Sequence, residues 1–224
     1  METRLALTTS YSLLWGTMQP GLLFDQLKQW KVKKVAITDR DNLYGYPACR
    51  QEAQRCNIEL ICAACLTEGN DAIFAFVQDQ KGYEQLCLLL TRRAQDRTFS
   101  YLPSLLADSE GLVLATTSPA LLTTLATSKA RLYGAITPTC LAAVQTARRL
   151  GIALLACDDA LLQDKMDEEV HRILRCMALH KTVGTLEHHD CSPPGKVLLD
   201  PDQWNRAFSC WPDAVDNANQ LKAY

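Results

Sequence analysis

The sequence predicts an α/β protein built as one barrel-like domain of alternating strands and helices. Short apolar segments rich in β-branched residues alternate with segments whose apolar residues recur at helical spacing. No break in composition divides the 224 residues, and a chain of this length fits one α/β barrel. The hydrophobic share of 48% and the charged share of 21% are typical of a globular protein with a substantial core.

The repeating plan is clearest in the stretch 34–46. Apolar residues predict a buried strand, the polar residues Thr38, Asp39 and Arg40 follow it, and a helix then runs to Cys56. In barrels and open sheets of this class, the carboxyl ends of the strands form the rim where catalytic and binding groups gather. Functional residues are therefore expected directly after the strands.

The other elements follow in order. The first strand covers 4–8, and Pro20 opens a helix in which Leu23, Leu27 and Trp30 recur at positions i, i+4 and i+7. Asn57 ends the helix that follows the second strand. The remaining predicted strands are 59–63, 73–77, 112–115, 132–136, 152–156 and 197–199, and the remaining predicted helices are 82–94, a short helix from Pro103, 119–126, 201–207 and 212–221.

Two further helices are predicted from capping residues. Thr137 can cap a helix with Pro138 at its first position, where the missing N–H of proline costs no hydrogen bond. Asp164 is expected to cap a helix that extends to Ala178. The residues expected to face the core from that helix are Val170, Leu174 and Met177.

Charge and hydropathy exclude several classes of protein. A net charge of −2 gives no clustered positive excess, so strong direct DNA binding by this chain is not expected. No apolar run is long enough to cross a bilayer, and the N-terminus lacks the order of a signal peptide, which predicts a cytoplasmic protein without membrane contact. The ten cysteines lie mostly in apolar patterns and are expected to be free thiols.

Five co-linear motifs carry a resemblance to a known family. They are T-S-Y-S-L-L-W-G at 9–16, A-I-T-D-R-D-N-L-Y-G at 36–45, K-G-Y-E-Q-L at 81–86, G-L-V-L-A-T at 111–116 and L-L-A-C-D-D-A-L-L at 154–162. From about residue 4 onward the chain resembles the polymerase and histidinol phosphatase (PHP) domain of bacterial family C DNA polymerases, the alpha subunit of DNA polymerase III. The resemblance implies a distorted seven-stranded (β/α) barrel, similar to a TIM barrel, with a metal cluster at the carboxyl ends of its strands.

The same resemblance gives the domain organisation. Residues 1–224 form a single PHP-like domain. Within it, 184–224 is a C-terminal extension that either closes the barrel or leads to a polymerase region. The polar pattern still present at 213–221 suggests that more chain followed.

Position by position, the resemblance implies that the metal site is dismantled. Of the ligand positions of the family, only Asp159 keeps a ligand, and the replaced positions are Ala6, Thr8, Trp15, Arg40, Cys65, Ala72, Ser118 and Leu161. Binding a divalent ion and activating water require several imidazoles and carboxylates in one cavity, and a cation at Arg40 would repel the metal. No catalytic residue, bound metal or other cofactor is therefore expected, and side chains such as Trp15 and Leu161 are expected to fill the rim.

The remaining rim residues have structural interpretations. The candidates are Asp39, Arg40, Asp158, Asp159 and His171. The carboxylates of Asp158 and Asp159 are expected to make structural hydrogen bonds or to pair with Arg40. His171 matches a family position outside the metal site and is expected to be a buried structural histidine.

Two other groups could bind metal. Cys62 and Cys65 form a C-x-x-C pair, but no second pair exists and no helix N-terminus is predicted beside it, so inert thiols are favoured. The segment with His180, His188, His189 and Cys191 has spacing that loosely suits zinc, although exposed histidines are common in such turn-rich stretches.

These observations favour a catalytically inactive PHP domain of a DNA polymerase III alpha subunit, acting in DNA replication as a structural and protein-docking module. The parent protein would be a DNA-directed DNA polymerase. The partners implied by the resemblance are a polymerase region of the same or a companion chain and a proofreading exonuclease subunit. One alternative is a metal-dependent phosphoesterase or 3′-5′ exonuclease with a rebuilt zinc or manganese site, and another is a free-standing scaffold that lost its polymerase.

Overall fold

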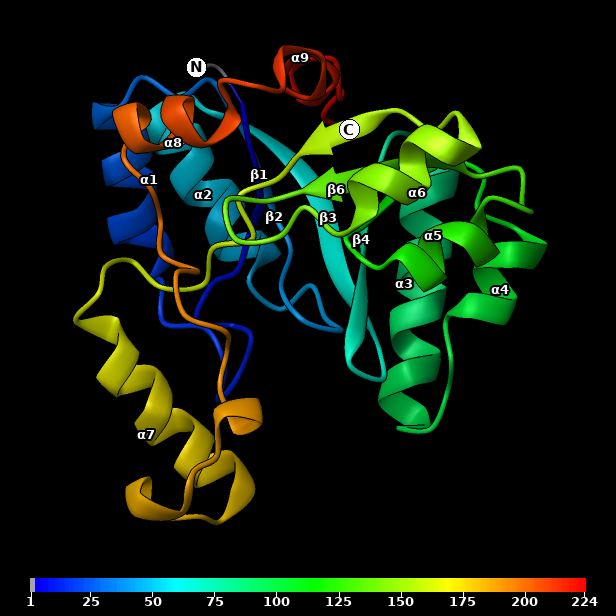
Figure 1. Ribbon diagram of the computed structural model, residues 1–224. Helices are drawn as coiled ribbons and strands as arrows, with labels where there is room; N and C mark the ends of the chain where they lie inside the picture. Colours follow the sequence, from blue (N-terminus) through cyan, green and yellow to red (C-terminus); the bar gives the residue numbers. More distant parts are fainter. Residues whose placement is uncertain (1–2) are drawn as a thin grey trace.

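A computed structural model describes residues 3–224 and contains one seven-stranded sheet in the order β1-β2-β3-β4-β5-β6-β7. The strands are β1 (Thr3–Leu7), β2 (Lys34–Ile37), β3 (Glu59–Glu68), β4 (Asp71–Val77), β5 (Leu112–Thr116), β6 (Arg131–Ile136) and β7 (Leu154–Ala156). The helices are α1 (Pro20–Gln29), α2 (Tyr46–Cys56), α3 (Gln80–Gln95), α4 (Leu102–Ala107), α5 (Pro119–Leu125), α6 (Ala143–Leu150), α7 (Asp167–Leu179), α8 (Pro201–Phe208) and α9 (Pro212–Asn219). Figure 1 shows the helices arranged around the sheet.

The sheet curls into a nearly closed barrel. β1, β2 and β3 are parallel, as are β5, β6 and β7, whereas β4 runs antiparallel to both of its neighbours. At the seam, the backbone N–H of Asp158 donates to the carbonyl of Leu5 and that of Thr8 donates to Ala160, each at 2.8 Å. The predicted distorted seven-stranded (β/α) barrel is confirmed, and the reversed β4 is the source of its distortion.

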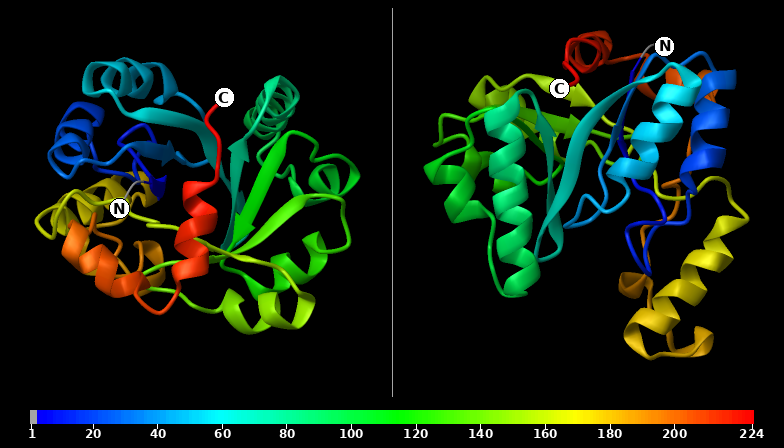
Figure 2. Two further views of the ribbon diagram at one scale, coloured as in Figure 1. Left: turned by 90° about the horizontal axis from the view of Figure 1, so that it is seen from above. Right: turned by 180° about the vertical axis from the view of Figure 1, so that it is seen from behind.

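The barrel interior is filled by alternate residues of the strands. Ile61, Ala63 and Cys65 of β3 face inward, because successive strand side chains point to opposite faces. At the amino-terminal end of the barrel, Ala218 of α9 and Leu221 join the same apolar cluster, and Figure 2 shows α9 lying across that end. The segment after 184 therefore covers one end of the barrel and leaves the other end open.

Most predicted elements are present within a few residues, and three predictions at element ends are wrong. α6 begins at Ala143, because Thr137 and Cys140 pair in a tight turn (N–H to carbonyl, 2.9 Å) that contains Pro138. Asp164 accepts a hydrogen bond from the Met166 N–H and precedes α7, which starts at Asp167. The segment 197–199 makes a single isolated bridge, between Val197 and Leu162, and is not a strand.

The expected inward face of α7 is also wrong. Val170, Ile173 and Met177 are 46%, 53% and 60% exposed, whereas His171 is buried. Figures 1 and 2 show α7 standing away from the barrel, so most of its circumference faces solvent. The helical spacing of the apolar residues was read correctly, but spacing alone does not identify which side of a helix meets the core.

Candidate functional site

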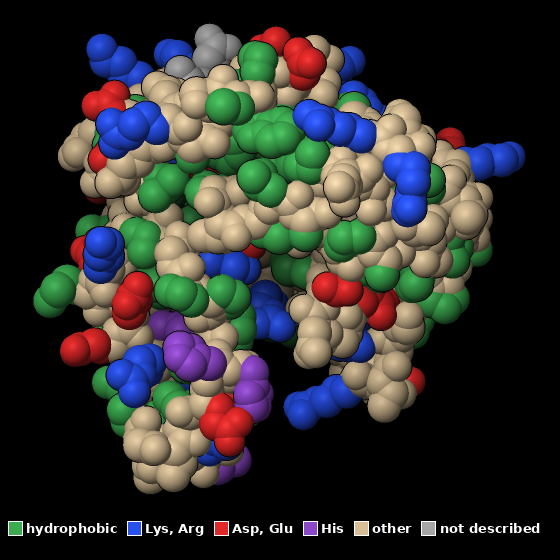
Figure 3. All heavy atoms as spheres, in the orientation of Figure 1, with side chains coloured by type: hydrophobic (Ala, Val, Ile, Leu, Met, Phe, Trp, Pro, Cys, Tyr) green, Lys and Arg blue, Asp and Glu red, His purple; other side chains and the backbone are tan. Residues whose placement is uncertain are grey.

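A cavity of about 780 Å³ lies at the carboxyl ends of the strands. Its walls come from the loop after β1, the end of β2, the turn between β3 and β4, the segment after β7, α7 and the residues near 188–196. Figure 3 shows a hollow at this place, with basic and histidine side chains around it. Trp15 and Leu161 line this cavity but do not close it, so the expectation that they fill the rim is wrong.

The family-derived positions meet in this cavity. Thr8, Trp15, Arg40, Cys65, Ala72 and Leu161 all line it, together with Asp159. The other two replaced positions do not line it: Ala6 is buried in the barrel core, and Ser118 caps α5 and donates to the Asp71 carboxylate (2.7 Å). The barrel thus keeps the cavity while most of its wall consists of side chains that do not ligate metals.

The residues present do not fit the metal cluster that the fold implies. Across residues 3–224, no group of three or more His, Cys, Asp or Glu side chains is arranged to hold a metal ion. Asp159, the one remaining ligand position, is paired with the Lys196 ammonium at 2.6 Å. A divalent cation would have to displace that ammonium and would meet the charge of Arg40, which also acts on Asp159.

Asp39 holds the loop that follows β1. One carboxylate oxygen accepts hydrogen bonds from the Thr9 N–H (2.8 Å) and from the Ser12 hydroxyl (2.9 Å). The Ser12 hydroxyl in turn accepts from the N–H of Arg40 at 2.9 Å. Burial raises the pKa of Asp39, and these hydrogen bonds act in the opposite direction. Asp39 is therefore a structural residue that fixes the loop carrying Trp15.

The two consecutive aspartates after β7 have different partners. The buried Asp158 forms an ion pair with Arg4. Asp159 adopts the left-handed backbone conformation (φ 51°), lines the cavity and pairs with Lys196. The predicted pairing with Arg40 is wrong for both as a direct ion pair, because other cations, which the sequence pattern did not identify, lie closer.

His171 is a structural histidine, as predicted. Its Nε2 accepts a hydrogen bond from the Ser192 N–H (2.9 Å), so the proton lies on Nδ1, which donates to the Trp15 carbonyl (2.7 Å). Its ring contacts the Trp15 ring edge-on, with centroids 5.2 Å apart. Burial lowers the pKa of His171, and the positive charges of Arg175 and Arg40 lower it further. The neutral ring fastens α7 to the loop after β1.

Two arginines contact the Trp15 ring. The guanidinium carbon of Arg40 lies 3.9 Å from the ring centroid and that of Arg175 lies 4.7 Å from it. The sequence analysis missed Arg175 and Lys196. Arg175 could have been found, because it lies four residues after His171 and therefore on the same, inward side of α7. No comparable signal marks Lys196, which lies in an irregular segment.

The cysteine pair and the histidine-rich segment do not form metal sites. Cys62 packs in the outer layer and Cys65 inside the barrel, because residues three apart in a strand point to opposite faces. Burial raises the pKa of both thiols to about 12, which makes them inert. His188, His189 and Cys191 line the cavity, whereas His180 ends α7. All ten cysteines are free.

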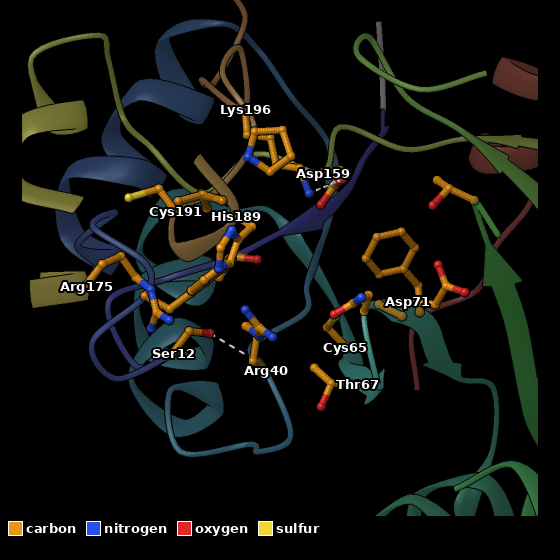
Figure 4. Close-up of a pocket in the computed structure, with 18 of the residues that line it drawn as sticks. Ser12, Arg40, Cys65, Thr67, Asp71, Asp159, Arg175, His189, Cys191 and Lys196 are labelled. Carbon is orange, nitrogen blue, oxygen red and sulfur yellow. Dashed lines mark hydrogen bonds and ion pairs between the residues drawn. The ribbon is translucent and has the colours of Figure 1, made fainter. Parts of the chain in front are cut away.

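Comparison with known proteins identifies the family. The model of the PHP domain family matches residues 5–181, most of the chain. The chain belongs to the PHP domain family. Figure 4 shows the cavity of this PHP domain, with Arg40, Arg175 and Lys196 entering from different elements and Asp71 on the opposite wall from Arg175.

The similar proteins include DNA polymerases. The chain is 20% identical to error-prone DNA polymerase 1 of Agrobacterium fabrum over 97% of its own length, and 26% identical to the error-prone DNA polymerase of Bradyrhizobium diazoefficiens over 94%. It spans only 22% and 21% of the length of these two polymerases. It is therefore related to the PHP domains of DNA polymerases.

A solved structure shows the same fold. A protein from Bifidobacterium adolescentis, assigned as a metal-dependent phosphoesterase, superimposes with a TM-score of 0.51 over 93% of this chain and 96% of its own, at 12% identity. The likeness extends to the barrel architecture alone. In the part of the chain from residue 3 onward, no helix has both the length and the apolar character needed to cross a membrane.

Proposed function

We propose that this chain is a PHP domain without hydrolytic activity that serves a DNA polymerase in replication as a structural and docking module. The observation that carries the proposal is the composition of the cavity: the positions expected to ligate metal hold Thr8, Trp15, Arg40, Cys65, Ala72 and Leu161. A hydrolytic centre needs ligands that deprotonate and converge on the ion. Aliphatic and cationic side chains cannot provide them.

The first experiment tests hydrolysis. Protein purified without a metal-affinity tag should contain no stoichiometric metal, and it should not hydrolyse phosphomonoesters or phosphodiesters in added manganese or zinc, because no ligand cage closes around the ion. The measurements are elemental analysis and a phosphate-release assay. Bound metal together with turnover that disappears in Asp159→Ala would contradict the proposal and favour the phosphoesterase alternative.

The docking role is supported by the outer face of α7. Met166, Val170, Ile173 and Met177 recur at intervals of four, three and four residues, so they form one stripe, and they are 46–81% exposed. Contiguous exposed apolar surface of this kind marks protein interaction sites. Three acidic residues in the first turn of α7 flank the stripe, so its partner should be apolar with a basic edge.

The occupant we propose for this stripe is a polymerase region, either of the same chain or of a companion chain. The support is that the similar polymerases are almost five times as long as the part they share with this chain. In such proteins the PHP-like part has a large neighbouring region against which it can pack. The cavity and the stripe then have separate roles, because the stripe lies on the outer side of α7 and Arg175 on its inner side.

The second experiment tests docking. Ile173→Asp should weaken binding to the purified polymerase region of the same organism at least about tenfold, because a charge would be buried in an apolar contact. The control is Leu22→Asp on α1, which changes a leucine that is 61% exposed. Calorimetric titration gives both affinities. Equal affinities for the two variants would contradict the role of α7, and weakened binding to a proofreading exonuclease instead would assign the stripe to that partner.

A further inference from the structure

Two cations in the cavity have no carboxylate partner. Lys196 is paired with Asp159, but among residues 3–224 neither Arg40 nor Arg175 forms an ion pair with a carboxylate. Arg175 instead donates to the carbonyls of Asp190 (2.7 Å) and Leu14 (3.4 Å). The positive charge on this side of the cavity is therefore not balanced by the protein.

The two guanidinium groups also act on each other and on their surroundings. Burial and the charge of Arg40 lower the pKa of Arg175. The same two charges contribute to the lowered pKa of His171. Like charges held together around one indole ring raise the energy of the empty cavity, and an anion between them would lower it.

The rest of the cavity selects a class of anion. Guanidinium groups bind planar or tetrahedral oxyanions through paired N–H donors, most strongly when the anion carries more than one negative charge. Hydroxyl groups of Thr8, Ser12, Thr67 and Thr117 line the same cavity. The volume of about 780 Å³ lies within the range of sites for small organic ligands, so it has room for a phosphate and an attached group.

The carboxylates of the cavity do not oppose this ligand directly. Asp159 is neutralised by Lys196 at 2.6 Å. Asp71 accepts a hydrogen bond from Ser118, and Figure 4 places it on the wall opposite Arg175. An anion held by Arg40 and Arg175 would therefore lie on the positive side of the cavity.

We propose that this cavity binds a phosphate dianion between Arg40 and Arg175 without any metal ion. Arg40 occupies a position where the family resemblance places a metal-ligating histidine, so a fixed side-chain cation stands where a metal would attract the same phosphate. This inference rests on the proposed loss of hydrolysis, because the phosphate is bound and released unchanged. The protein would act as a sensor or holder of a phosphate-bearing small molecule.

The test is calorimetric titration with inorganic phosphate in the presence of EDTA. Saturable binding is expected, and Arg40→Gln and Arg175→Gln should each weaken it at least about tenfold. Arg40→Lys, which keeps the charge and loses the paired donors, should fall between the native protein and Arg40→Gln. Arg172→Gln on the exposed side of α7 is the control and should bind as the native protein does. Circular dichroism and melting temperature confirm that each variant is folded.

The outcomes separate the ligand source and the two proposals. Titrations with deoxyadenosine monophosphate and with deoxyadenosine distinguish a nucleotide from free phosphate: at least about tenfold tighter binding of the nucleotide indicates a nucleotide, and equal binding indicates phosphate itself. No saturable binding, binding lost in EDTA, or binding unaffected by both arginine variants overturns this inference and leaves the absence of hydrolysis standing. Phosphate release in added manganese overturns the proposed function, whatever the EDTA titration gives.

Discussion

Replacing Asp158 by asparagine is expected to lower the free energy of unfolding by about 3–5 kcal/mol, because it removes the counter-charge from a buried guanidinium group. The side chains of Arg4 and Asp158 are 0% and 3% exposed. Water cannot replace the lost carboxylate at that depth, so the cost of keeping the Arg4 charge dry is no longer offset. Chemical denaturation of the native and variant proteins measures the difference.

The neighbouring residue provides a matched control. Asp159→Asn removes a carboxylate from the pair with Lys196, whose two side chains are 19% and 21% exposed, and it should cost at most about 1 kcal/mol. Asparagine also tolerates the left-handed conformation at this position (φ 51°). Equal losses for the two variants would contradict the assignment of the buried pair. Adding Arg4→Met to Asp158→Asn should recover part of the loss, because both charges are then gone.

The ion pair has this importance because of its place at the barrel seam. The second carboxylate oxygen of Asp158 accepts a hydrogen bond from the Leu5 N–H (3.1 Å), and Arg4 donates to the carbonyl of Leu199 (3.0 Å). These contacts join β1, the end of β7 and the segment before α8. Thr8 and Asp159, which line the cavity, follow directly from this seam, so its rigidity fixes one wall of the site.

The barrel could be predicted from local sequence because its signals are local. Apolar strands followed by polar residues and amphipathic helices specify their own type within about 10–15 residues. The reversal of β4 follows from the short connection at Gly69, which adopts a positive φ of 59° and leaves no room for a crossover helix. The direction of α7 could not be predicted in this way, because its surroundings are set by the distant segments around Trp15 and Ser192.

The candidate site was predictable in its position and not in its charges. Family motifs placed Thr8, Arg40 and Asp159 on one rim, and the structure brings them into one cavity. The partner of Asp158 is Arg4, which is 154 residues away along the chain, and no local pattern connects them. Arg175 and Lys196 reach the cavity from irregularly placed segments for the same reason. Ion pairs in a barrel depend on which rim loops face each other, and that is decided only by the closed fold.

Replacing Gly82 by alanine is expected to lower the free energy of unfolding by about 3 kcal/mol, because the backbone of α3 lies directly on another backbone segment. A Cβ atom at Gly82 would lie 2.0 Å from the carbonyl oxygen of Gly111. Gly111 has φ +75°, and a Cβ there would in turn meet the nitrogen of Gly82 at 2.3 Å. The two glycines thus fasten α3 to the start of β5, and neither side can move away without breaking the Asp79 cap on the Gly82 N–H (2.9 Å).

A second helix glycine isolates the effect of this contact. Gly21 lies in the first turn of α1, and a Cβ there would meet no atom within 4 Å. Gly21→Ala should therefore stabilise the protein by a few tenths to about 1 kcal/mol, through the better helix propensity of alanine and the smaller entropy of the unfolded chain. Gly82→Ala gains the same propensity, so the difference between the two variants in chemical denaturation measures the cost of the backbone contact. If both alanines stabilise the protein, α3 does not pack on Gly111 as closely as the structure shows.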